Sequence, residues 1–141
     1  LRVTKESLYN AIEQARVDNL LGDVSYAVQK KAKEYNYGVV RELVGHGVGR
    51  ALHEEPKVPN YGYRGRGIQL KEGLVLAIEP MINMGTQKVR FLSDGWSVVT
   101  QDGKPSAHFE HTVAIMKSGP KVLSSFAFIE DELKKNGIEI L

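Results

Sequence analysis

The spacing of apolar residues along the first 38 positions predicts two amphipathic helices. The first is expected over residues 5–17, with Thr4 as its N-cap. Its apolar face has members at three- and four-residue steps: Leu8, Ala11, Ile12 and Ala15. The second helix is expected over residues 24–35, with Asp23 as its N-cap, and the segment 36–38 is typical of a left-handed helix end. The chain is therefore expected to begin with a helical pair.

After Gly38 the pattern changes to short runs that are rich in β-branched residues and separated by Gly and Pro. These runs predict strands at 39–44, 74–78, 89–91, 97–100, 109–116 and 121–123. Two helices followed by a mainly antiparallel sheet place the chain in the α+β class. Residues 124–141 are expected to form an extension with a short helix, since Phe126, Ile129 and Leu133 recur at helical steps.

Composition excludes several classes of function. The 141 residues suffice for one core, and no apolar run approaches the roughly 18 residues of a spanning helix, so we expect no membrane partner. An excess of only two positive charges predicts no specific nucleic-acid partner. The alternating aromatics and arginines of residues 61–67 fit RNA stacking, and equally a plain surface loop. The chain has no Cys, which excludes disulfides, thiolate nucleophiles and Cys-based zinc sites.

The residues that carry chemistry are two histidines and two glutamates. His46 and His53 belong to a Gly-rich segment, where a strand end followed by a glycine-permitted loop would turn both imidazoles toward one cavity. The alternative is a Gly-rich turn with two surface histidines. Glu79 ends one apolar run and Glu110 stands at the head of another. A carboxylate in such a strand needs a cation or a hydrogen-bond donor unless it faces solvent.

No other catalytic arrangement competes with these residues, because the sequence has neither a Gly-x-Ser-x-Gly elbow nor a phosphate-binding loop. One His and two carboxylates, supported by a second imidazole, suit a hard or borderline divalent metal such as Mn, Co, Fe or Zn. Three ligands of this kind are too few to hold two metals.

The same residues stand in segments that resemble the type I methionine aminopeptidases. These segments are His46-Gly47-Val48-Gly49, His53-Glu54-Glu55-Pro56, Val58-Pro59-Asn60-Tyr61, Ala77-Ile78-Glu79-Pro80-Met81 and Glu110-His111-Thr112. Their order and spacing are similar to those of that family and leave no room for the large insertion of the type II enzymes. The resemblance implies that residues 1–123 form the C-terminal half of the catalytic domain, which is one half of the family's pita-bread fold.

The resemblance also implies roles for individual residues in a site with two metals. His46 and Glu79 would ligate one metal, Glu110 would bridge both, and Glu79 would also move a proton as general acid and base. His53 would contact the scissile amide. Trp96 would line the pocket for the methionine side chain, with an ordinary core position as the alternative. The family's two aspartate ligands match no aspartate of this chain.

The function implied by the resemblance is the removal of N-terminal Met from nascent proteins in the cytoplasm, near the ribosome, with two divalent ions (Co, Mn, Fe or Zn) in the full-length enzyme. The isolated chain is expected to bind metal weakly or singly and to be inactive. It is also expected to self-associate through the surface that would contact the other half. The alternatives are a prolidase-like metallopeptidase and a non-catalytic module of the same fold that binds peptides or proteins.

Overall fold

The structure is a computed structural model that describes residues 1–138. It begins with the two predicted helices, α1 (Arg2–Gln14) and α2 (Leu21–Glu34), each starting before the expected residue. Thr4 and Asp23 are therefore wrong as N-caps. Thr4 is buried inside α1, and the Asp23 carboxylate accepts a 2.8 Å hydrogen bond from the backbone N–H of Leu20. Asp23, in the first turn of α2, thus provides an acceptor for the backbone N–H of the residue that precedes the helix.

Ten strands follow α2 in the described part of the chain. They are β1 (Gly38–Val39), β2 (Gly45–Gly47), β3 (Glu54–Val58), β4 (Val75–Ile78), β5 (Met81–Asn83), β6 (Val89–Phe91), β7 (Val98–Thr100), β8 (Ser106–His108), β9 (His111–Met116) and β10 (Gly119–Val122). Five of the six predicted runs correspond to β4, β6, β7, β9 and β10. The predicted strand 39–44 is wrong beyond Val39, because Arg41 and Glu42 lie exposed in a bend.

All strand pairs in the described sheets are antiparallel, which confirms the predicted class. A five-stranded sheet has the order β10–β9–β4–β2–β3, a three-stranded sheet the order β1–β5–β8, and β6 and β7 form a hairpin. The pairs β4–β9 and β5–β8 share one register, in which Ile78 lies opposite His111 and Met81 opposite His108. The two sheets are therefore continuous at this point.

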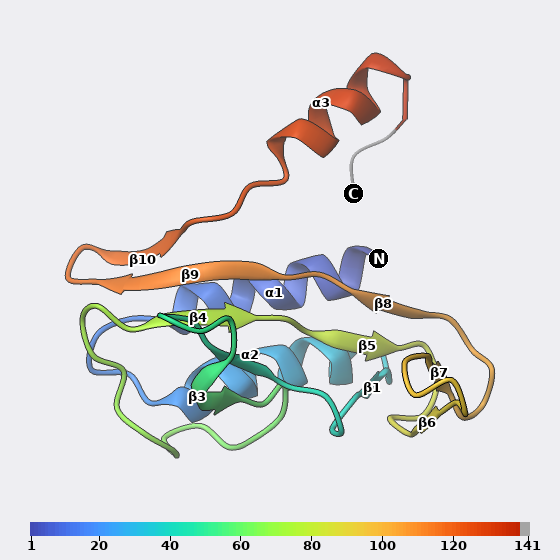
Figure 1. Ribbon diagram of the computed structural model, residues 1–141, viewed down its shortest axis with the longest axis horizontal. Helices are drawn as coiled ribbons and strands as arrows, with labels where there is room; N and C mark the ends of the chain where they lie inside the picture. Colours follow the sequence, from blue (N-terminus) through green and yellow to red (C-terminus); the bar gives the residue numbers. More distant parts are fainter. Residues whose placement is uncertain (139–141) are drawn as a thin grey trace.

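Helices α1 and α2 lie together on one side of the strands (Figure 1). The core comprises side chains of both helices and of the central strands: Leu8, Ile12, Val24, Val28, Leu76, Ile78, Val113 and Ile115. Side chains alternate between the two faces of a strand, so Ala77 and Glu79 point away from the face of Leu76 and Ile78. The face opposite the helices is thus left for the candidate site.

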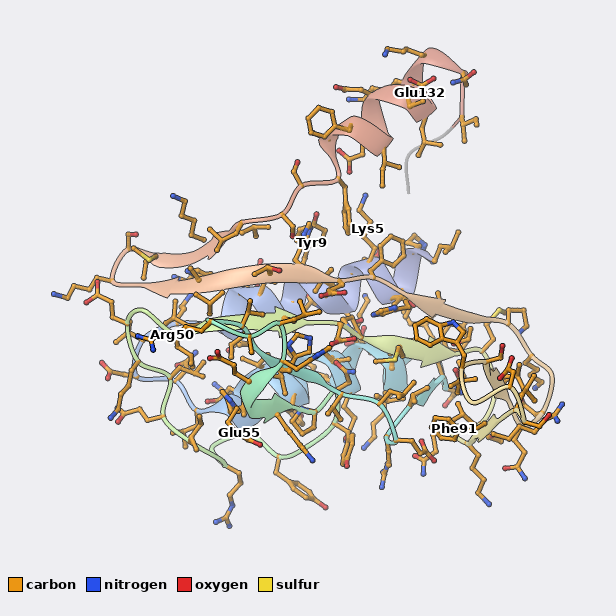
Figure 2. The ribbon with its side chains drawn as sticks, in the orientation of Figure 1. Lys5, Tyr9, Arg50, Glu55, Phe91 and Glu132 are labelled. Carbon is orange, nitrogen blue, oxygen red and sulfur yellow. The ribbon has the colours of Figure 1, made fainter. Side chains whose placement is uncertain are left out.

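The predicted C-terminal helix is present as α3 (Ala127–Lys135), which extends away from the rest of the chain in Figure 1. None of its residues is buried. Its start is held by Phe126, whose ring lies 4.2 Å from that of His111, and by an ion pair of 3.1 Å between Lys5 and Glu130. Figure 2 shows Lys5 between α1 and α3. Among residues 1–138, no helix has the length and apolar content needed to cross a membrane.

Candidate metal centre

Strand β2 brings His46 into the sheet because two glycines flank it. A Cβ atom on Gly45 would collide with the backbone oxygen of Ala77, and one on Gly47 with that of Glu55. Only glycines therefore let β2 fit between β4 and β3. The Nδ1 atom of His46 lies 2.9 Å from the carbonyl oxygen of Gly47. Because a carbonyl oxygen only accepts hydrogen bonds, Nδ1 is the donor in this contact, and Nε2 is the nitrogen that faces Glu79.

Glu79 and Glu110 face one another across two neighbouring strands. The β4–β9 ladder ends where Ile78 pairs with His111, and the register continues unchanged into the β5–β8 ladder. Between the two ladders this register places Glu79 opposite Glu110, at a point where Pro80 has no N–H to donate. Like charges directly opposite one another on adjacent strands are destabilising, so this pair favours a cation.

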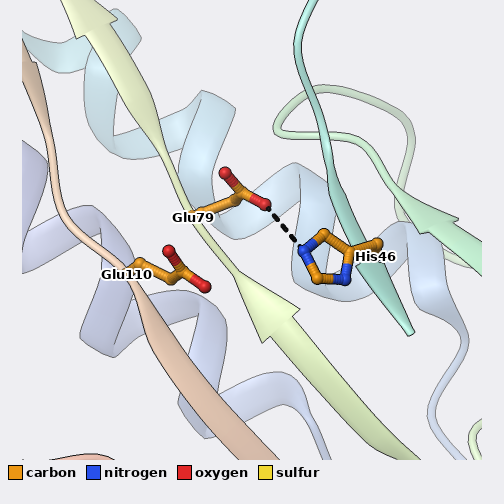
Figure 3. Close-up of side chains that lie close together, drawn as sticks. All are labelled: His46, Glu79 and Glu110. Carbon is orange, nitrogen blue, oxygen red and sulfur yellow. Dashed lines mark ion pairs between the residues drawn. The ribbon is translucent and has the colours of Figure 1, made fainter. Parts of the chain in front are cut away.

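His46, Glu79 and Glu110 come together as predicted (Figure 3). Each offers one ligand atom, and these atoms all lie within 4.8 Å of one another. The Nε2 atom of His46 is 3.6 Å from Oε1 of Glu79, and both side chains are 14% exposed, whereas Glu110 is exposed. One imidazole nitrogen and two carboxylate oxygens that converge in this way fit a divalent metal. Within residues 1–138, no aspartate joins the group.

His53 lies beside His46 in the loop that leads into β3. The two imidazole rings are 4.2 Å apart between centroids, at an angle of 63°. Both rings and Glu79 line a cavity of about 710 Å³, whose wall also includes the apolar residues Leu43 and Met81. The prediction that a glycine-permitted loop turns both imidazoles toward one cavity is thereby confirmed.

Glu79 has two further contacts, with His108 and Asn60, that were not predicted from the sequence. His108, the last residue of β8, places Nε2 at 3.4 Å from Oε2 of Glu79. Asn60 is completely buried, and its side-chain N–H donates a 3.0 Å hydrogen bond to the main-chain oxygen of Glu79. The sequence does indicate where His108 points. Side chains alternate between the two faces of a strand, so His108, two residues before Glu110, lies on the same face as Glu110. No pattern in the sequence pairs Asn60 with Glu79.

Trp96 occupies the turn between β6 and β7 and is 90% exposed. The Asp94 carboxylate shapes this turn by accepting hydrogen bonds from the backbone N–H groups of Trp96 and Ser97. Trp96 does not line the cavity beside His46. Its place in the wall of the pocket for the methionine side chain stays a prediction, whereas the alternative of a core position is wrong, because the ring is exposed. The Asp-Gly pair that precedes Trp96 belongs to the turn of a surface hairpin.

His111 follows Glu110 but turns to the opposite face and is buried. Its Nδ1 atom lies 2.7 Å from the hydroxyl oxygen of Ser124, and its Nε2 atom lies 3.3 Å from the hydroxyl oxygen of Tyr9. Burial lowers the pKa of the His111 imidazole, and the nearby Lys5 ammonium lowers it further. His111 is therefore neutral at pH 7 and connects β9 to α1 and to the C-terminal segment.

Comparison with known proteins places these residues in a family. Residues 1–117 match the model of metallopeptidase family M24. The methionine aminopeptidase of Clostridium perfringens is 54% identical over 124 residues, which are 88% of this chain and 50% of that protein. The crystal structure of the methionine aminopeptidase from Thermotoga maritima has a TM-score of 0.84 and 48% identity, covering 86% of this chain and 49% of that one. The chain thus spans about half the length of these aminopeptidases.

A prolidase from Pyrococcus furiosus is a more distant structural neighbour, with a TM-score of 0.64 and 27% identity over 88% of this chain and 31% of that one. The predicted α+β, pita-bread architecture is confirmed by these neighbours. The family match includes His46, Glu79 and Glu110, the three residues whose ligand atoms converge. On its sequence, its fold and this ligand group, the chain belongs to metallopeptidase family M24.

Proposed function

We propose that this chain is part of a methionine aminopeptidase, which removes N-terminal Met from peptides and nascent proteins. The names and the identity of its relatives support this substrate. Because the chain spans about half of those relatives, the activity and partners of the whole protein are part of the proposal. So are its location in the cytoplasm and its action near the ribosome.

The main support for the proposal is the pair of opposed carboxylates, Glu79 and Glu110, with the His46 imidazole beside them. One ligand atom each of His46, Glu79 and Glu110 lies within 4.8 Å of the others, and Nε2 of His46 faces Oε1 of Glu79 at 3.6 Å. These three residues would hold a divalent metal such as Mn, Co, Fe or Zn, with a second ion completed by residues outside this chain. A metal in such a site supplies Lewis acidity to a carbonyl group and lowers the pKa of water.

The chain's own residues provide the remaining chemistry. In the proposed reaction, a carboxylate oxygen of Glu79 accepts a proton from the attacking water and delivers it to the amine that leaves. His53, beside His46 on the cavity wall, donates a hydrogen bond to the scissile amide and stabilises the developing negative charge. The cavity of about 710 Å³ lies in the size range of small-ligand sites and suits the end of a peptide.

The test is the release of Met from a Met-Ala-Ser peptide by the full-length protein supplied with Co²⁺ or Mn²⁺. Glu79→Gln should abolish turnover, because the amide neither ligates as a carboxylate nor carries the proton. Glu72→Gln is the matched control, because Glu72 is an exposed carboxylate in the turn before β4 and pairs with Lys117 at 3.5 Å. Near-normal activity of Glu79→Gln would contradict the proposal.

For the 141-residue chain by itself, we propose binding of one divalent ion and no turnover. Its described residues supply three ligands, and one imidazole with two carboxylates is too small a set for two metals. Calorimetric titration with Mn²⁺ or Co²⁺ should give one site per chain, and two tight sites would contradict this. Self-association of the chain is a further part of the proposal, and sedimentation that shows a monomer at all concentrations would exclude it.

Two alternative functions give different results in the same assays. A prolidase-like enzyme, suggested by the more distant structural neighbour, would cleave X-Pro dipeptides in preference to the Met peptide. A non-catalytic binding module would bind peptides without turnover in the full-length protein. The 54% identity to a methionine aminopeptidase, against 27% to a prolidase, favours the first proposal.

A further inference from the structure

We propose that His108 is a positioning residue for Glu79, which holds one oxygen of this carboxylate so that the other is directed at His46 and its metal. The contact itself is a property of the chain. Its consequence for metal binding rests on the proposed function.

Each oxygen of Glu79 has an imidazole of its own. Oε1 lies 3.6 Å from Nε2 of His46, and Oε2 lies 3.4 Å from Nε2 of His108. A metal held at Nε2 of His46 would have Oε1 as the nearer oxygen of Glu79. With His108 beside Oε2, Glu79 would keep one orientation and offer Oε1 to that metal.

The backbone fixes His108 in this place. His108 pairs with Met81, two residues beyond Glu79, so β8 and β5 bring the imidazole to the same stretch as the carboxylate. At the far end of the same pairing, the Ser106 hydroxyl donates a 2.7 Å hydrogen bond to Oδ1 of Asn83, which is completely buried. Strand β8 is therefore anchored at both ends of its pairing with β5.

His108 also lines two cavities. It lines the cavity of about 710 Å³ that contains His46 and Glu79, and also an apolar cavity of about 590 Å³ that contains Glu110 and Phe126. Its side chain is 46% exposed, so the contact with Glu79 contributes little to the stability of the fold. Its effect is expected in the orientation of Glu79 and not in folding.

The first measurement is the affinity of the protein for Co²⁺ by calorimetry. Residues that orient a metal ligand typically change affinity by about 10–100-fold when replaced, and we expect His108→Leu to lie near the lower end, about tenfold. His108→Gln keeps an N–H donor at a similar reach and should restore most of the affinity. Lys117→Ala, on the exposed β9–β10 turn, is the control and should bind as the parent does.

Two results would overturn the proposal: parent-like affinity in His108→Leu, or equal loss in His108→Gln and His108→Leu. The second result would mean that the loss of Co²⁺ affinity comes from packing, or from a need for the imidazole itself, and not from an N–H group beside Glu79. Urea unfolding of all variants checks that the fold is retained.

A second measurement needs no metal. In the metal-free protein, Glu79→Gln should shift the proton resonances of the His108 ring, which are assigned by their disappearance in His108→Gln. The Lys117→Ala control should leave them in place. If Glu79→Gln does not move the His108 resonances, the contact is absent and the proposal fails. If the contact is present but the parent binds no Co²⁺, it is the proposed function that fails.

Discussion

Replacing Asn60 with Asp should destabilise the fold much more than replacing it with Leu. Asn60 donates to the main-chain oxygen of Glu79, while its own Oδ1 is buried without a hydrogen-bond partner among the described residues. Asn60→Leu removes a donor, leaving the Glu79 oxygen unpaired, and also removes the unpartnered acceptor. Each buried unpaired group costs about 1–3 kcal/mol, so the two changes offset one another. We expect the free energy of unfolding to change by less than about 2 kcal/mol.

Asn60→Asp has nearly the same size but places a carboxylate oxygen against the Glu79 carbonyl oxygen. An uncompensated buried charge destabilises a fold by about 3–5 kcal/mol. Burial raises the pKa of the introduced carboxyl group in the folded state, and in its protonated form it can again donate to Glu79. The folded state therefore binds the proton more tightly than the unfolded state. The destabilisation is smallest below the unfolded pKa of about 3.9 and grows as the pH rises toward the folded pKa.

The assay is urea unfolding followed by far-UV circular dichroism at neutral pH and near pH 4. Asn10→Asp is the matched control, because it makes the same chemical change at an exposed position of α1. Equal losses of free energy in Asn60→Asp and Asn60→Leu at neutral pH would contradict this prediction. So would a loss in Asn60→Asp that does not shrink in acid.

Three further predictions concern the core, the hairpin and a surface turn. Leu76→Ala should lower the free energy of unfolding by about 2–5 kcal/mol in urea, because Leu76 is completely buried in the central strand β4. Trp96→Ser should change it by less than about 0.5 kcal/mol, and the fluorescence of Trp96 in the parent should not respond to added metal, since the ring is 90% exposed. Backbone N–H groups of Thr86 and Lys104 lower the pKa of Asp102, so this carboxylate contributes stability above its unfolded pKa and loses it as the pH falls through the lowered folded value. Asp102→Asn should therefore be less stable than the parent at neutral pH, with a difference that disappears in strong acid, as thermal unfolding at several pH values would show.

The parts of the fold that depend on local pattern could be predicted from the sequence. Helical spacing predicts α1, α2 and α3, and runs of β-branched residues predict the longer strands, because each is a property of neighbouring residues. The same holds for the candidate ligands. An imidazole among glycines and two glutamates at the ends of apolar runs are unusual enough to be recognised without a structure.

Strands β2, β3, β5 and β8 could not be predicted, because they are short or rich in Gly, Glu and Pro. Their backbone groups find partners only in the strands beside them. Trp96 shows the converse limit. Its aromatic ring favours burial as a residue type, but the ring stands in the turn between β6 and β7 and is 90% exposed.

Local sequence is enough to identify the residues that could bind a metal, whereas the way in which they meet depends on strand pairing. The register that sets Glu79 opposite Glu110 is a property of two strands about 30 residues apart, and a shift of one residue would turn one of the carboxylates to the other face. The same register places His108 against Glu79. Its i, i+2 relation to Glu110 assigns the face, but only the pairing of β5 with β8 determines which carboxylate it contacts.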